Sequence, residues 1–115
     1  MRKTDKKIDN QLRLVLTDAC EAALKEIDGF QWLTHRVNYS NFPKSLKIIC
    51  VFETNEQLAN FTSNSKSSKK LFTALIQTKL NETAVNFKNV TEHILYDTEE
   101  NCATDHHGNW ADRLG

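Results

Sequence analysis

One short run of the sequence, Ser45 to Glu53, is apolar enough to form the central strand of a small sheet. Successive side chains of a strand point to opposite faces. One face of this strand carries Leu46, Ile48, Cys50 and Phe52. Ile49 and Val51 make the opposite face apolar as well. Because an apolar face must be covered, a strand with two such faces belongs in the middle of a sheet, with material packed on both sides.

The residues before this run predict a helix followed by a strand. Apolar residues recur at helical spacing from about Asp5 to Ile27, and Gly29 then offers the conformational freedom that closes a helix. From Phe30 to Tyr39 the side chains alternate in the manner of a strand. The turn around Pro43 is too short for a crossover, so this strand pairs antiparallel with the central run.

The second half of the chain predicts two helices and one more strand. Thr54 and Gln57 have the spacing of a capping box, which indicates a short helix. Residues 62–70 are polar and basic and read as an exposed loop, and the apolar stripe from Leu71 to Leu80 predicts the next helix. Residues 90–96 predict the third strand, and the acids of residues 97–100 are typical of a helix start.

The order α-β-β-α-α-β predicts an α+β fold, a two-layer domain over residues 1–96 with helices packed on a three-stranded sheet that is mixed or antiparallel. Basic residues outnumber acidic ones in residues 1–90, whereas residues 91–115 are acidic and contain Arg113 as their one basic side chain. We expect residues 97–115 to form a helical C-terminal segment packed on the domain. Trp110 is the best candidate to cover the second face of the central strand.

The composition indicates a cytosolic protein that is not membrane-bound. Fifteen basic and 15 acidic residues give a formal net charge of zero, so no field of the whole molecule attracts nucleic acid or a membrane. No run is long and apolar enough to span a bilayer, and the basic N-terminus leads into an amphipathic segment instead of a signal peptide. Cys20, Cys50 and Cys102 are odd in number and widely spaced, which argues against disulfides and zinc ribbons.

The basic loop is the strongest candidate for a binding site. Lys66, Lys69 and Lys70, with Lys79 further along, could contact the phosphates of RNA, of DNA or of the ribosome. The alternative is a protein-interaction module, with a homodimer formed through an exposed face or edge of the sheet. In that alternative the acidic C-terminal segment could serve for docking.

A further alternative is a metal or redox role near the C-terminus. Cys102 and His106 are four residues apart and share a helical face, with His107 next to them and His93 at the third strand. A structural zinc site needs four ligands, so this pattern favours a polar tail over a metal site. No cofactor motif and no nucleophile with a matching His and acid is present, and we therefore expect a protein that is not an enzyme.

The order of elements over residues 5–96 is similar to that of type II KH domains and of the BolA-like fold. Resemblance to KH domains implies contact with a nucleic-acid backbone, where this chain offers the lysines of residues 63–70 in place of a Gly-x-x-Gly loop. Resemblance to BolA-like proteins implies a functional histidine at the start of the strand that follows the helix pair, and His93 occupies that position.

Several short motifs also resemble an uncharacterised family of small γ-proteobacterial proteins that are sometimes labelled Fis-like transcriptional regulators. The motifs are Met1 to Lys7, Gly29 to Leu33, the Phe42-Pro43 turn and Tyr96 to Glu100. This resemblance runs along the whole chain and implies a bacterial origin and a regulatory role.

Overall fold

The computed structural model describes residues 3–63, 66–83 and 85–115, with the side chains of residues 66 and 67 outside that description. The helices are α1 (Lys3–Glu26), α2 (Asn55–Ser63), α3 (Lys66–Asn81), α4 (Glu99–His106) and α5 (Trp110–Leu114), with 3-10 turns η1 (Tyr39–Asn41) and η2 (Val90–His93). The strands are β1 (Phe30–Arg36), β2 (Lys47–Phe52) and β3 (Ile94–Thr98). The predicted α+β fold is confirmed.

The three strands form one mixed sheet with β2 in the middle. β1 pairs antiparallel with β2, with Leu33 opposite Cys50, and β3 pairs parallel with β2, with Tyr96 opposite Cys50. A parallel pairing requires a crossover, which α2 and α3 provide. The central position of the run that is apolar on both faces is therefore confirmed.

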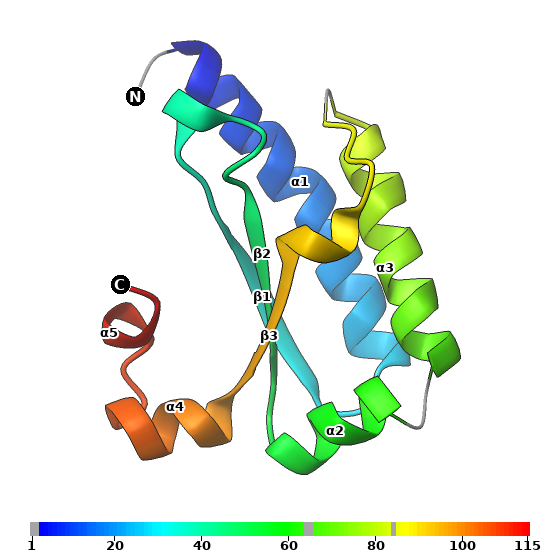
Figure 1. The fold of residues 1–115 in the computed structure, drawn as a ribbon, viewed down its shortest axis with the longest axis vertical. Helices are drawn as coiled ribbons and strands as arrows, with labels where there is room; N and C mark the ends of the chain where they lie inside the picture. Colours follow the sequence, from blue (N-terminus) through cyan, green and yellow to red (C-terminus); the bar gives the residue numbers. More distant parts are fainter. Residues whose placement is uncertain (1–2, 64–65, 84) are drawn as a thin grey trace.

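One face of the sheet is covered by α1 and α3, which pack against each other (Figure 1). The side chains of Ile48, Cys50 and Phe52 point into this layer and are fully buried. They meet the apolar stripes of the helices, contributed by Leu12, Leu16, Ala19 and Ala23 of α1 and by Phe72, Ile76 and Leu80 of α3. Burial of side chains of this size stabilises the fold by about 1.5–3 kcal/mol each, so this layer is the main core.

The C-terminal helices α4 and α5 lie on the opposite side of the sheet (Figure 1). On this side Val51 is fully buried and Ile49 is 5% exposed. The ring of Trp110 meets the ring of Trp32 edge to face, with centroids 4.9 Å apart. Trp110 therefore packs on this side of the sheet through Trp32 of β1, which pairs with Val51 of the central strand. Leu95, which lies opposite Ile49, stays 44% exposed.

The end of α1 depends on Gly29. Its φ angle of +83° lies in the left-handed region, and its carbonyl accepts a hydrogen bond of 2.9 Å from the backbone N–H of Glu53. The neighbouring capping box is also present, because the side chains of Thr54 and Gln57 bond each other's backbone N–H groups at 3.1 and 3.2 Å. Within the described ranges, no helix has both the length and the apolarity needed to cross a bilayer.

The prediction of an exposed loop over residues 62–70 is wrong in its described part. α2 continues to Ser63 and α3 starts at Lys66, while residues 64 and 65 lie outside the described ranges. The hydroxyl groups of Thr62 and Ser63 donate to backbone carbonyls one turn earlier, that of Ala59 among them. Hydroxyl residues can satisfy their side chains inside a helix in this way, so their presence does not end it.

Three predicted boundaries also differ from the structure. The first strand ends at Arg36 instead of Tyr39, which lies in η1. Residues 90–93 form η2 instead of a strand, because the Asn89 side chain accepts a hydrogen bond from the N–H of Thr91 and caps a turn. Residues 97 and 98 complete β3, and Thr98 then caps α4 by accepting from the N–H of Asn101 at 3.0 Å.

Candidate functional site

A basic groove of about 440 Å³ lies where α2, α3 and η2 meet. Its lining consists of Thr62, Lys69, Lys70, Thr73, Ala74, Gln77, Val90 and Thr91. Two lysines, the Thr91 hydroxyl and the Gln77 amide can donate hydrogen bonds into this hollow, whereas the hydroxyls of Thr62 and Thr73 already donate to backbone carbonyls of their own helices. None of these lining residues is acidic. This combination suits an anionic ligand.

The two lysines of the basic groove are held differently. The ammonium group of Lys69 lies 5.7 Å from the centre of the Tyr96 ring, within the range of a cation–π interaction. Lys70 is exposed. Lys66 begins α3, and its side chain is outside the structure's description. Of the four predicted lysines, the structure thus places Lys69 and Lys70 together.

Lys79 is separated from the basic groove and is paired with acids. Its ammonium nitrogen lies 3.8 Å from a carboxylate oxygen of Asp18 and 3.4 Å from one of Glu82. The contact with Asp18 joins the second half of α3 to α1, and the contact with Glu82 is local to the end of α3. A lysine whose charge is shared by two carboxylates is a weak phosphate ligand, so Lys79 is better explained as a link between the helices.

The C-terminal residues that suggested a metal are used inside the fold. Cys102 is fully buried in α4, and burial raises the pKa of its thiol. The Nδ1 atom of His106 lies 3.3 Å from Nη1 of Arg113, which can only donate, so Nδ1 accepts. His107 takes the left-handed conformation at the end of α4, with φ of 53°, and is exposed.

His93 lies at η2 and is held by two contacts. Its Nδ1 atom is 2.8 Å from the carbonyl oxygen of Leu46, and its ring stacks on that of Phe87 with centroids 3.7 Å apart. The carbonyl can only accept, so Nδ1 carries the proton. Over residues 3–63, 66–83 and 85–115, no three His, Cys, Asp or Glu side chains are grouped so that they could hold a metal ion.

A network of polar contacts fastens the C-terminal segment to the sheet. The guanidinium group of Arg113 forms a bidentate pair with the carboxylate of Asp97, and its Nη1 reaches Asp105 at 3.1 Å. Hydrogen bonding to Asp97 raises the pKa of Arg113 above its usual value. The two indole N–H groups of Trp32 and Trp110 donate to the two oxygens of the Glu99 carboxylate at 2.6 and 3.1 Å.

A second polar cluster joins α1 to the end of β1 and to η1, and the sequence patterns did not indicate it. One oxygen of the Asp9 carboxylate accepts from the hydroxyl of Tyr39 at 2.7 Å and lies 3.0 Å from Nε2 of His35. Its other oxygen is 3.1 Å from Nε of Arg13. The hydrogen bond from Tyr39 is the main reason that the pKa of Asp9 is lowered.

A groove of about 510 Å³ runs between α1 and β1 beside this cluster. It is lined by Asp9, Arg13, Leu16, Thr17, Cys20, Glu21, Leu33, Thr34 and His35. Cys20 and His35 line it together, but Cys20 is three helical turns from Asp9, or about 16 Å along the axis of α1. Among the described residues, His35 forms its hydrogen bond with Asp9, and no His bonds a Cys or Ser. The cluster therefore does not form a catalytic triad.

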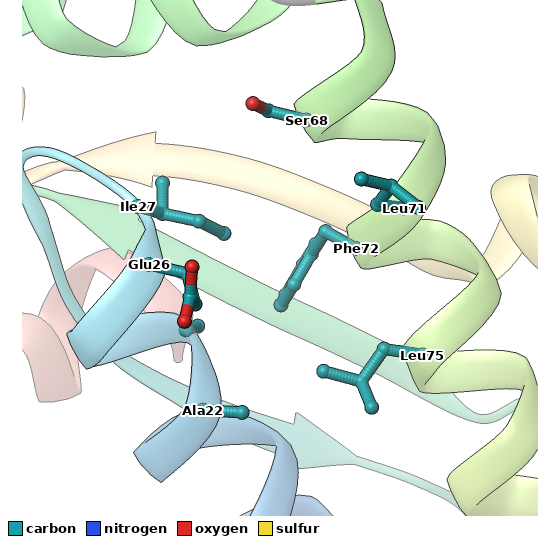
Figure 2. Close-up of a pocket in the computed structure, with 8 residues that line it drawn as sticks. Ala22, Glu26, Ile27, Ser68, Leu71, Phe72 and Leu75 are labelled. Atoms are coloured by element: carbon teal, nitrogen blue, oxygen red, sulfur yellow. The ribbon is translucent and has the colours of Figure 1, made fainter.

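A third hollow, of about 310 Å³, separates the facing sides of α1 and α3 (Figure 2). Leu71, Phe72 and Leu75 of α3 face Ile27 and Ala22 of α1 across it. Glu26 and Ser68 are the polar lining residues, and Leu71 is 71% exposed. Its lining contains the carboxylate of Glu26 and neither Lys nor Arg, so it is unsuitable for phosphate.

Comparisons with protein families, with curated proteins and with solved structures give no match for this chain. The resemblance to the Fis-like proteins therefore stays a prediction, as does the implied kinship with KH or BolA-like proteins. Function must be inferred from the geometry and the charges of the chain itself.

Proposed function

We propose that this chain is a non-enzymatic nucleic-acid-binding protein of the bacterial cytosol that contacts the phosphate backbone through the basic groove. The observation that supports this proposal is the lining of the groove, where Lys69 and Lys70 stand beside the Thr91 hydroxyl and no lining residue is acidic. Lysine ammonium groups act as point charges for phosphate, and hydroxyl groups add hydrogen bonds to phosphate oxygens.

The binding should be largely independent of sequence. Specific readout of single strands uses aromatic side chains on which bases stack, and specific readout of duplexes uses an element that enters a groove. The residues that line the basic groove include no aromatic ring, and Tyr96 lies beneath Lys69. Contacts of this kind position a phosphate backbone without selecting a base.

The carboxylates of the acidic C-terminal segment do not neutralise the positive charge of the basic groove. Those of Asp97, Glu99 and Asp105 are occupied by Arg113 and by the two indoles. The segment lies on the side of the sheet opposite α3, which carries the lysines (Figure 1). A formal net charge of zero therefore coexists with a locally basic surface.

The proposal is tested by fluorescence anisotropy with labelled single-stranded RNA and labelled duplex DNA at about 50 mM and about 200 mM salt. The variant Lys69→Ala/Lys70→Ala removes the two lysines of the groove. The control variant Lys6→Ala/Lys7→Ala removes the same charge from exposed positions of α1. Far-UV circular dichroism checks that both variants are folded.

We expect the groove variant to weaken binding more than the control at every salt concentration. Loss of two phosphate contacts should also reduce the slope of log affinity against log salt by about 1.5. The difference between the RNA and DNA arms identifies the preferred nucleic acid. No binding of either probe at the lower salt concentration, or equal weakening by the two variants, would show that the proposal is wrong.

A further inference from the structure

The outer edge of β1 is open for pairing with another strand. β1 is the first strand in the order β1-β2-β3, so no strand of residues 3–63, 66–83 and 85–115 pairs with its second edge. The described elements in substantial contact with it are β2 on its inner edge and α1 on the helix side. Its sequence, FQWLTHR, contains neither the Pro nor the Lys with which proteins protect such edges.

The flank of α1 beside this edge is unusually apolar for a surface. Leu14 is 70% exposed and Leu24 is 51% exposed. Together with Thr17 and Glu21 they follow the spacing of 3, 4 and 3 residues that aligns side chains on one side of a helix. Thr17 and Glu21 line the groove between α1 and β1, so this stripe borders the open edge of the sheet.

We propose that two copies of this chain form a symmetric dimer by antiparallel pairing of their β1 edges, which would join two three-stranded sheets into one. This inference goes beyond the proposed function. A twofold axis near Thr34 places Thr34 opposite its own copy and Arg36 opposite the partner subunit's Trp32, all on one face. Thr17 lines the same groove as Thr34, so the same axis can pass close to both.

The charges on α1 are self-complementary about this axis. Arg13 and Glu21 lie four residues before and after Thr17. In an antiparallel pair of α1 helices centred on Thr17, Arg13 therefore meets the partner subunit's Glu21, and the contact occurs twice. Arg13 is 71% exposed, and its Nε is held 3.1 Å from Asp9, which keeps its guanidinium at the groove.

The face of the sheet gives a second complementary pair. Arg36 is exposed, and the Trp32 that it would meet donates to the Glu99 carboxylate at 2.6 Å. An arginine can stack on an indole ring and approach the carboxylate beside it. Because both α1 and β1 match their own copies about one axis, a second copy fits this edge better than an unrelated strand does.

The first experiment measures the mass by sedimentation equilibrium between about 1 and 100 μM, which brackets dissociation constants typical of modest interfaces. The wild-type chain should reach twice its mass of 13.2 kDa. The variants are Arg13→Glu, Glu21→Arg and the double exchange Arg13→Glu/Glu21→Arg. Lys7→Glu makes the same charge change as Arg13→Glu at an exposed position of α1 that lies about two turns before Leu14, where the stripe begins.

Each single exchange brings like charges together twice and should raise the dissociation constant about tenfold, since a loss of about 1.4 kcal/mol has this effect. The double exchange should restore the dissociation constant to within about threefold of wild type, because the attraction is rebuilt with reversed sign. Lys7→Glu should leave it unchanged. The double exchange does not restore the contact between residue 13 and Asp9. Recovery of the dimer in this variant would therefore come from the contact between subunits.

A second experiment tests the register of the strands. Cα atoms that face each other across an antiparallel pair are about 4.5–5.5 Å apart, a distance that a disulfide can bridge. Thr34→Cys should therefore form a covalent dimer on mild oxidation, whereas Lys47→Cys, on the same face of β2, should not. A monomeric mass at about 100 μM, or single charge exchanges without effect, would overturn the proposal.

Discussion

At the scale of single residues, Asp9 connects three parts of the fold that are far apart in the sequence. Its carboxylate belongs to α1, His35 belongs to β1 and Tyr39 to η1. The side chain of Asp9 is 14% exposed, and that of His35 is 13% exposed. A carboxylate that accepts hydrogen bonds in so sheltered a place is stabilised in its ionised form, which accounts for its lowered pKa.

The first prediction concerns Asp9→Asn and pH. A carboxylate with a lowered pKa in the folded state contributes stability above its unfolded pKa, near 3.8, and loses it as pH falls through the folded value. The variant should be less stable at neutral pH by about 1–3 kcal/mol. Urea denaturation between neutral and acidic pH should also show that the variant loses less unfolding free energy on acidification than the wild-type chain does.

Asp28→Asn is the control for this pH experiment, because Asp28 is exposed at the end of α1. Its stability should follow that of wild type at every pH. If Asp9→Asn and wild type lose stability in parallel on acidification, Asp9 does not provide the linkage.

The second prediction compares two glycines that both have positive φ angles. A Cβ atom on Gly29 would lie 2.5 Å from the side-chain amide of Gln57 and 2.7 Å from its Cβ, so α2 would have to move. A Cβ on Gly108 meets nothing within 4 Å. Gly108→Ala should therefore cost about 1 kcal/mol, the strain of the left-handed conformation alone. Gly29→Ala should cost at least about 2 kcal/mol more, because a steric overlap is added.

Thermal unfolding followed by circular dichroism measures both glycine variants. Equal losses of stability would mean that the contact with Gln57 is relieved without cost.

The residues of the candidate sites were only partly accessible to prediction. Lys69 and Lys70 are neighbours in the sequence, so their place in one groove follows from local order. Asp9 and His35 are 26 residues apart, and only the packing of α1 on β1 brings them together. A usable signal was an acid at the margin of the apolar stripe of α1. The sequence did not indicate which residue this acid contacts, because no spacing rule connects a residue of a helix to a residue of the neighbouring strand.

At the scale of elements, periodic segments were predicted well and segments governed by side-chain caps were not. The apolar stripe of α1 and the apolar run of β2 carry their own signal over many residues. The residues around Asn89 and Thr98 instead depend on single hydrogen bonds, through which Asn89 starts η2 and Thr98 starts α4. Asp97 and Thr98 therefore end a strand, although acids of this kind are also typical of a helix start.

The third prediction concerns the ion pair between Arg113 of α5 and Asp97 of β3. The side chains of Arg113 and Asp97 are each 17% exposed, so the pair is intermediate between surface and interior. Arg113→Ala would leave the Asp97 carboxylate without its bidentate partner and should cost about 2 kcal/mol, between the values for exposed and buried pairs. Adding Asp97→Asn should recover part of this loss, because the unpaired charge is removed.

Urea denaturation of the single and double variants measures this coupling between Arg113 and Asp97. Losses that simply add would indicate that the two residues act independently. Arg113→Lys provides a further comparison, because an ammonium group keeps the charge but cannot form the bidentate pair.

At the scale of the whole molecule, the C-terminal segment completes the fold around the central strand. Residues 97–115 pack on the face of the sheet that carries Val51, where Trp110 meets Trp32, and α1 and α3 cover the other face. Both layers pack on the same sheet. Loss of one layer therefore exposes apolar side chains of the sheet to water and weakens the packing of the other layer. The chain should then unfold as one cooperative unit instead of shedding its tail first.

The two tryptophans allow this fourth prediction to be measured in the unmodified chain. Trp32 and Trp110 are its only tryptophans, and their rings meet at the contact between α5 and the sheet. Tryptophan fluorescence therefore reports on the C-terminal segment, while far-UV circular dichroism reports mainly on α1 and α3. The two signals should give the same urea midpoint and slope, because coincident transitions are the mark of two-state unfolding. A fluorescence change at lower urea would show instead that the tail detaches from a sheet whose second face can stand uncovered.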